Sequence, residues 1–170
     1  ALKAGYRAID TAAIYQNEEA VGEAIKASGV AREDLFITTK VWNADQGYDN
    51  TLKAFELSLQ KLGLDYVDLY LTHWPKPQLV DTYKAIERLY EEKLIRVPGV
   101  SNHHEHHLQQ IFAEANVLPM VNQIECHPSL SQDALRAFCA EHNIAVTAWA
   151  PLGTGIVFTH PVVKQLAEKY

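Results

Sequence analysis

Short apolar segments alternate with longer amphipathic segments along this chain. Six segments have the length and composition of buried strands, namely residues 6–10, 35–40, 66–73, 95–101, 121–125 and 144–149. Between them apolar residues recur three or four positions apart, over residues 20–25, 52–62, 82–92, 107–115 and 134–142, which is the period of an amphipathic helix. Strands that alternate with helices predict a parallel sheet, because a parallel connection needs a crossover segment.

Two parallel folds suit this pattern, a doubly wound sheet and a (β/α)8 TIM barrel. A barrel takes about 250 residues, and at this strand spacing 170 residues hold about six βα units. The chain opens on "ALKAG", which has the pattern of a helix tail ended by Gly5, and closes inside another helical pattern, "PVVKQLAEKY". We therefore expect one α/β domain over residues 1–170 that covers about six units of a TIM barrel, with the first and last strands absent.

Three strands in succession end on an ionisable side chain, at Asp10, Lys40 and His73. Each lies in phase with the residues two and four positions before it, so the three point to the same face of the sheet. In a barrel the carboxyl ends of the strands meet at one mouth, where active sites lie. Tyr15 follows the first strand closely enough to reach that mouth. A turn residue, a surface lysine, a core histidine and a loop anchor are the structural alternatives, but the shared phase favours a site.

These four side chains suit the protonation of a carbonyl oxygen. A free phenol has a pKa of about 10, and a nearby ammonium lowers that value. We expect Lys40 to lower the pKa of Tyr15, Asp10 to hold Lys40 charged, and His73 to orient the substrate oxygen. Tyr15 would then act as a general acid. No side chain supplies a hydride, so the chemistry requires a nicotinamide cofactor.

Polar and aromatic residues at the ends of the later strands suit such a cofactor. Ser101, Asn102 and Gln123 offer the donors and acceptors that a carboxamide needs, and the flat ring of Trp149 suits stacking on a nicotinamide. A turn-forming asparagine, an internally bonded glutamine and a core tryptophan explain the same residues without a ligand. The residues by themselves leave both interpretations open.

The motifs "GYRAIDTAAIYQNEEAVGEAI", "LFITTKVW", "DYVDLYLTHWP", "GVSN", "VNQIECHP" and "AWAPLG" occur in this order. Together they closely resemble the aldo-keto reductases, nearly over the whole length, and most resemble the bacterial 2,5-diketo-D-gluconate reductase branch. The resemblance implies a TIM barrel that reduces aldehydes and ketones with NADPH, with 2,5-diketo-D-gluconate or another small keto sugar or aldehyde as a possible substrate.

The family's site residues carry over onto this sequence position by position. The catalytic residues are Asp10, Tyr15, Lys40 and His73. The cofactor residues are Ser101, Asn102, Gln123 and Trp149, with Leu152 near the pyrophosphate, and the substrate-pocket residues are Trp42 and Trp74. The family's segment for the adenosine 2′-phosphate would lie beyond Tyr170, so a preference for NADP over NAD is implied by the resemblance alone. Pro98 departs from the pattern, because proline removes a donor from a strand ladder.

The composition of the chain excludes some classes of function but identifies no catalytic residues. The chain is 48% hydrophobic and 21% charged, with a formal charge of -6, and this balance indicates neither a nucleic-acid surface nor a membrane segment. Cys126 and Cys139 lack the spacing of a metal site or a disulfide framework, so we interpret them as reduced core thiols. We expect a cytoplasmic monomer with a small carbonyl substrate as its partner.

Four clustered histidines, at positions 103, 104, 106 and 107, invite a zinc interpretation. No cysteine or aspartate joins them, so we expect a solvated helix start and no metal site. Two alternatives to a reductase remain. Lys40 at a strand end would suit a Schiff-base aldolase, and some aldo-keto-reductase-like proteins act as non-catalytic regulatory subunits.

Overall fold

The computed structural model describes residues 1–170 and contains six strands and six α-helices. The strands are β1 (Ala8–Asp10), β2 (Phe36–Val41), β3 (Val67–Thr72), β4 (Ile95–Ser101), β5 (Val121–Glu125) and β6 (Ala145–Trp149). The α-helices are α1 (Glu18–Ser28), α2 (Tyr48–Leu62), α3 (Leu79–Glu91), α4 (Glu105–Phe112), α5 (Asp133–Glu141) and α6 (Pro161–Lys169). Short 3-10 helices lie at η1 (Leu2–Ala4), η2 (Ala13–Tyr15), η3 (Arg32–Asp34), η4 (Asn43–Asp45) and η5 (Gly153–Thr159).

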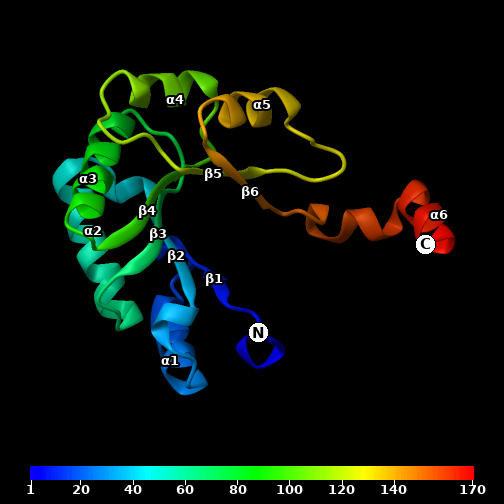
Figure 1. Ribbon diagram of the computed structural model, residues 1–170, viewed down its shortest axis with the longest axis horizontal. Coiled ribbons are helices and arrows are strands. Elements are labelled where there is room, and N and C mark those ends of the chain that lie inside the picture. The colour runs from blue at the N-terminus through cyan, green and yellow to red at the C-terminus, as the bar shows by residue number, and fades with distance from the viewer.

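The six strands form one parallel sheet in the order β1-β2-β3-β4-β5-β6. A doubly wound sheet reverses its strand order at a switch point, and this sheet does not, so that alternative is excluded. Figure 1 shows a curved sheet with helices α1 to α5 on its outer side, while η5 and α6 extend away from it. The prediction of six βα units of a barrel is confirmed. None of the helices has the length and apolar character needed to cross a bilayer.

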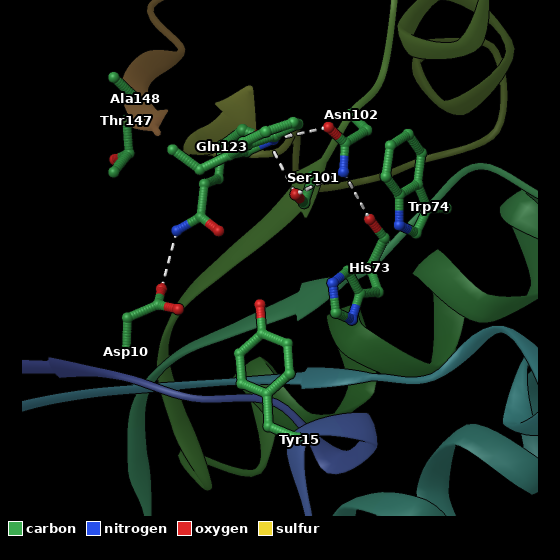
Figure 2. Close-up of a pocket in the computed structure, with 10 residues that line it drawn as sticks. Asp10, Tyr15, His73, Trp74, Ser101, Asn102, Gln123, Thr147 and Ala148 are labelled. Atoms are coloured by element: carbon green, nitrogen blue, oxygen red, sulfur yellow. Dashed lines mark hydrogen bonds between the residues drawn. The ribbon is translucent and has the colours of Figure 1, made fainter. Parts of the chain in front are cut away.

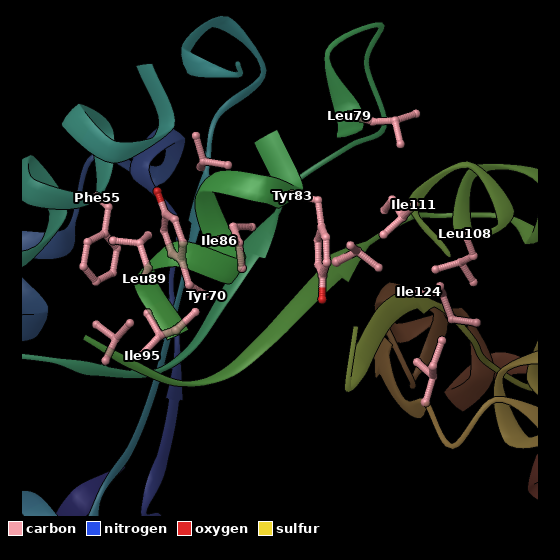
Figure 3. Packing of buried hydrophobic residues seen from close by; sticks show 14 of the residues in the cluster. Phe55, Tyr70, Leu79, Tyr83, Ile86, Leu89, Ile95, Leu108, Ile111 and Ile124 are labelled. Carbon is pink, nitrogen blue, oxygen red and sulfur yellow. The ribbon is translucent and has the colours of Figure 1, made fainter. Parts of the chain in front are cut away.

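The main hydrophobic core lies between the outer face of the sheet and the helices. Phe55 of α2 packs edge-on against Tyr70 of β3, with ring centroids 4.8 Å apart, and Figure 3 shows Ile86 and Leu89 of α3 beside them. The same cluster continues to Leu108 and Ile111 of α4 and to Ile124 of β5. Burying one such side chain contributes roughly 1.5–3 kcal/mol, so this layer holds the helices against the sheet.

The inner face of the sheet is packed over its central strands. Leu69 and Leu71 of β3 are buried there, and a Cβ at Gly99 of β4 would lie 2.7 Å from the Leu71 side chain and 2.9 Å from the Val121 carbonyl oxygen. Only glycine therefore fits this close approach. Pro98 sits in the interior strand β4, but its pairing with β5 begins one residue later, at Gly99 and Val121, so the missing N–H breaks no rung of that ladder.

An ion-pair network joins the amino-end side of three strands. Asp68 of β3 is fully buried and accepts hydrogen bonds from the Ile37 N–H at 2.8 Å and from Arg96 at 2.9 Å, and it forms a salt bridge with Arg32 at 2.8 Å. Arg32 also lies over the ring of Tyr66, 4.0 Å from its centroid. The hydrophobic pattern of the sequence did not predict this network, because Asp68 is a single acidic residue within the apolar segment of residues 66–73.

Candidate active site

A cavity of about 460 Å³ opens at the carboxyl ends of the strands (Figure 2). Its walls come from the loop after β1, from the ends of β3 to β6 and from the turns that follow them. The lining residues are Asp10, Tyr15, His73, Trp74, Ser101, Asn102, Gln123, Thr147, Ala148 and Trp149. The structure therefore brings together residues from positions 10 to 149, as the barrel prediction required.

Asp10 and Lys40 form an ion pair at the floor of this cavity. The Lys40 Nζ donates to Asp10 Oδ1 and, at 2.9 Å, to the Thr11 carbonyl oxygen. The Lys40 side chain is 1% exposed and that of Asp10 is 43% exposed. Burial lowers the pKa of Lys40, and the charge of Asp10 opposes that shift. Lys40 is thus fixed by its partners and lies below the cavity wall, since it is not among the lining residues.

Tyr15 ends the 3-10 helix η2 and points its hydroxyl into the cavity (Figure 2). The hydroxyl of Thr11 donates to the Asn17 side chain at 2.5 Å and so ties the two sides of this loop. The Lys40 Nζ lies 5.2 Å from the centroid of the Tyr15 ring. Burial, and then the charge of Asp10, raises the pKa of Tyr15 above its ordinary value. The predicted net lowering of this pKa is therefore wrong for this structure, because burial and the charge of Asp10 outweigh the attraction of the Lys40 ammonium.

His73 follows β3 directly and is neutral at physiological pH. Burial, and then the charge of Lys40, lowers the pKa of His73 to about 4, although Asp10 acts in the opposite direction. Its ring meets Tyr15 and Trp42 edge-on, at centroid distances of 5.7 and 5.2 Å. Its Nδ1 is buried and has no protein partner. A neutral imidazole has one N–H and one lone pair to offer, so His73 can orient an oxygen without carrying charge.

The predicted cofactor residues are linked to each other and to Asp10. Ser101 Oγ donates to the Gln123 carbonyl oxygen at 2.8 Å, and Gln123 Nε2 donates to Asp10 Oδ2 at 2.7 Å. The Trp149 Nε1 donates to Asn102 Oδ1 at 2.8 Å. Figure 2 shows these bonds spanning the cavity from β1 to the turn after β4. The sequence predicted the residues but none of these cross-links, since they join strands distant along the chain.

Three predicted residues lie outside the cavity lining. Lys40 lies beneath it, Trp42 reaches it only through contact with His73, and Leu152 is 54% exposed in the turn after β6. Trp74 does line the cavity. Conversely, Thr147 and Ala148 line it and were missed. Thr147 shares a strand face with Trp149, so the same alternation that selected Gln123 could have found it.

The histidine cluster differs from its prediction at one position. His104 and His106 are exposed, as expected of a solvated helix start, but His103 is completely buried. Its Nδ1 lies 2.8 Å from the Ser101 carbonyl oxygen, and burial lowers its pKa to about 4. The backbone pairs with Asn122, which accepts from the His103 N–H and donates to its carbonyl oxygen. No group of three or more histidine, cysteine, aspartate and glutamate side chains has metal-binding geometry.

The strand ends of this barrel-type sheet therefore bring together a phenol, an ion pair of a buried lysine with an aspartate, and a neutral histidine. The chain matches the Aldo/keto reductase family over residues 1–163. It belongs to that family.

Individual relatives agree with the family assignment. The chain is 56% identical over 171 residues to a glyoxal reductase of Bacillus subtilis, covering all of this chain and 62% of that protein. The crystal structure of a Gox0644 variant in complex with NADPH superposes with a TM-score of 0.94 at 44% identity, covering 99% of this chain and 62% of that one. A structure proposed by its name to be a 2,5-diketo-D-gluconic acid reductase B has a TM-score of 0.90 at 34% identity, covering 94% and 58%. The chain therefore spans about 62% of the length of its curated relative.

Proposed function

We propose that this chain carries the site of an NADPH-dependent reductase that converts a small aldehyde or ketone to an alcohol. One observation carries the proposal. The Tyr15 hydroxyl and the neutral His73 face one cavity, above the ion pair of the buried Lys40 with Asp10 and beside four side chains that suit a nicotinamide. A solved relative binds NADPH with the same fold.

The donor set fits the proposed cofactor. Ser101, Asn102 and Gln123 place hydroxyl and amide groups around one side of the cavity, and Trp149 adds a flat apolar face. Leu152, exposed beyond β6, would lie along the diphosphate. NADPH supplies a hydride when bound. The residues of this chain must supply the proton and orient the substrate.

The proton is held at the Tyr15 hydroxyl. Because burial and Asp10 raise its pKa, the phenol keeps its proton at neutral pH and can release it only when a stronger base appears. A carbonyl oxygen that gains negative charge is such a base. His73 directs that oxygen toward Tyr15, and the Lys40 ammonium, 5.2 Å from the ring centroid, stabilises the phenolate that remains.

The proposed substrate class is small and carries a second oxygen function. Trp74 forms part of the wall, and Trp42 contacts His73 edge-on, so aromatic side chains border the space beside Tyr15. The names of the relatives agree, since glyoxal carries two adjacent carbonyls and 2,5-diketo-D-gluconate two ketones. Selection of NADP over NAD is proposed by analogy with the NADPH complex.

The aldolase alternative has no support in the geometry. A Schiff-base lysine must reach the substrate carbon, and Lys40 is instead fixed below the cavity by Asp10 and the Thr11 carbonyl. The regulatory alternative predicts a chain that binds NADPH without turning over.

The test is NADPH consumption with glyoxal, followed by the fall in nicotinamide absorbance. Tyr15→Phe should slow reduction by roughly 10²–10⁴-fold, the usual contribution of a positioned acid, while NADPH affinity stays within a few-fold. Tyr170→Phe is the matched control, because Tyr170 is almost fully exposed. Full activity in Tyr15→Phe would refute the assignment. NADPH binding without turnover would favour the regulatory alternative, and borohydride trapping of a carbonyl on Lys40 would favour the aldolase.

A further inference from the structure

We infer that Asn102 is a positioning residue that fixes His73 and Trp149 relative to each other across the cavity mouth. The inference rests on the proposed function for its catalytic meaning, but its structural content can be measured separately. Family comparison and sequence pattern assign Asn102 to the cofactor. The hydrogen bonds assign it a second task within the protein.

Asn102 bonds to residues from four neighbouring strands or the turns that follow them. Its backbone N–H donates to the Gln123 carbonyl oxygen at 2.9 Å. Its Nδ2 donates to the His73 carbonyl oxygen at 3.0 Å and to Ser101 Oγ at 3.1 Å. Its Oδ1 accepts from Trp149 Nε1 at 2.8 Å. The side chain therefore uses both amide hydrogens and one lone pair within the protein, and one lone pair on Oδ1 remains.

The bond to His73 extends the sheet by one residue. The ladder between β3 and β4 ends at Thr72 and Val100, so His73 lies just beyond it. Its N–H still donates to the Val41 carbonyl oxygen at 3.3 Å, on the β2 side. Asn102 Nδ2 supplies the missing partner on the β4 side. His73 is thus held through its backbone on both sides, which fixes the direction of its imidazole.

The bond to Trp149 holds an aromatic ring of an edge strand. Strand β6 pairs with β5 alone in this sheet, and the Trp149 side chain reaches over β5 to the turn after β4. A tyrosine or phenylalanine ring would lack the indole N–H that makes this bond. The ring plane is therefore set by Asn102 as well as by its own strand.

The backbone conformation of Asn102 suits the hydrogen bonds that its side chain makes. Its φ is 62°, in the left-handed region where asparagine is more common than most residues. That conformation turns the side chain back over the strand ends. A residue that served only the turn would need this backbone conformation but not the side-chain hydrogen bonds. A second asparagine with a positive φ can therefore serve as the control.

The experiment compares Asn102→Gly with Asn143→Gly in the 170-residue chain. Glycine tolerates a positive φ, so each variant keeps its backbone and loses one side chain. Asn143 has a φ of 57° and is exposed, which makes it the matched control. The readouts are proton exchange of the three tryptophan indoles and the NMR titration of His73.

In the wild-type chain one indole proton should exchange slowly, and Trp149→Phe should abolish that signal. Asn102→Gly should speed its exchange by about tenfold or more, as expected when one hydrogen bond is lost, and should raise the titration midpoint of His73 from about 4. Asn143→Gly should change neither. In the reductase assay Asn102→Gly should lower kcat as well as raise the KM for NADPH, whereas Trp149→Phe should act mainly on KM.

Unchanged indole exchange and His73 titration in Asn102→Gly would overturn the inference even if the wild-type chain reduces glyoxal. If both signatures move but the wild-type chain consumes no NADPH, the positioning is supported and the proposed function fails. If Asn102→Gly does not fold, Trp149→Phe decides the matter, because the inference is wrong when all slowly exchanging indole protons survive in that variant.

Discussion

At the amino-end side of the strands the carboxylate of Asp68 is fully buried, and its cationic partners Arg32 and Arg96 are 20% and 60% exposed. At the carboxyl ends the arrangement is inverted. Lys40 is the buried ion, and its partner Asp10 is 43% exposed. Both are aspartate–cation pairs on a parallel sheet, yet they bury opposite partners.

The difference separates an ion pair that stabilises the fold from one that borders a reaction. Both oxygens of Asp68 are bonded, and Asp68 is not among the residues that line the active-site cavity. The Asp10–Lys40 pair lies under a cavity that is lined by His73, whose buried Nδ1 has no partner within the protein. A cavity beside the ion pair, rather than the presence of charge, marks the end of the sheet where a substrate can be bound.

The largest stability effect should come from Asp68→Ala. The change leaves the Ile37 N–H without a partner and two arginines without their shared acceptor, and breaking such a buried pair costs about 3–5 kcal/mol. Urea unfolding measures the loss. NADPH consumption per folded molecule should stay close to wild type, since Asp68 is remote from the cavity.

Asp65→Ala serves as the control for that variant, because Asp65 is exposed and lies three residues earlier. If Asp68→Ala lowers the free energy of unfolding by less than about 1 kcal/mol, this network contributes no more than ordinary surface ion pairs. The contrast between the amino and carboxyl ends of the strands would then not hold.

Lys40→Met should give the reverse pattern. Methionine fills the same volume without a buried charge, so the unfolding free energy should change by less than about 1 kcal/mol. Turnover should fall on the order of 10²–10³-fold, the usual cost of removing an electrostatic stabiliser. Lys84→Met, which alters an exposed pair with Glu114, is the control. Wild-type turnover in Lys40→Met would show that the buried cation has no part in the reaction.

The two histidines at the carboxyl ends predict a smaller, pH-dependent effect. The pKa values of His73 and His103 are about 4, below the ordinary value of 6.5. As pH falls below 6.5 the unfolded chain binds protons that the folded chain refuses, so stability is full above 6.5 and declines as pH falls toward 4.

The measurement is the urea midpoint between pH 6.5 and about 5, above the range in which carboxylates titrate. His103→Asn should flatten the decline, and His106→Asn, at an exposed position, should leave it intact. A wild-type midpoint that is constant over this interval would contradict the burial of neutral histidines.

The sequence predicted the strands within one or two residues, because apolar alternation and strand spacing are local signals. It also predicted Asp10, Tyr15 and His73 at one mouth, because parallel strands share their direction. It missed Asp68, whose partners lie 28 to 36 positions away along the chain, and the bond from Gln123 to Asp10 across 113 positions. The predicted direction of the Tyr15 pKa shift was also wrong, since that direction depends on which charge is nearer and how far the ring is buried.

The smallest expected effect distinguishes the two arginines that contact Asp68. Arg96 is mostly exposed and makes one bond to Asp68, so Arg96→Ala should cost about 0.2–1 kcal/mol. Arg32 is better buried, donates to the Leu35 and Tyr66 carbonyl oxygens and lies over the Tyr66 ring. Arg32→Ala should therefore cost at least twice as much in the same urea measurement. Equal costs for the two arginines would mean that Asp68 needs only net positive charge nearby, whereas unequal costs assign its stability to the planar, stacked geometry of Arg32.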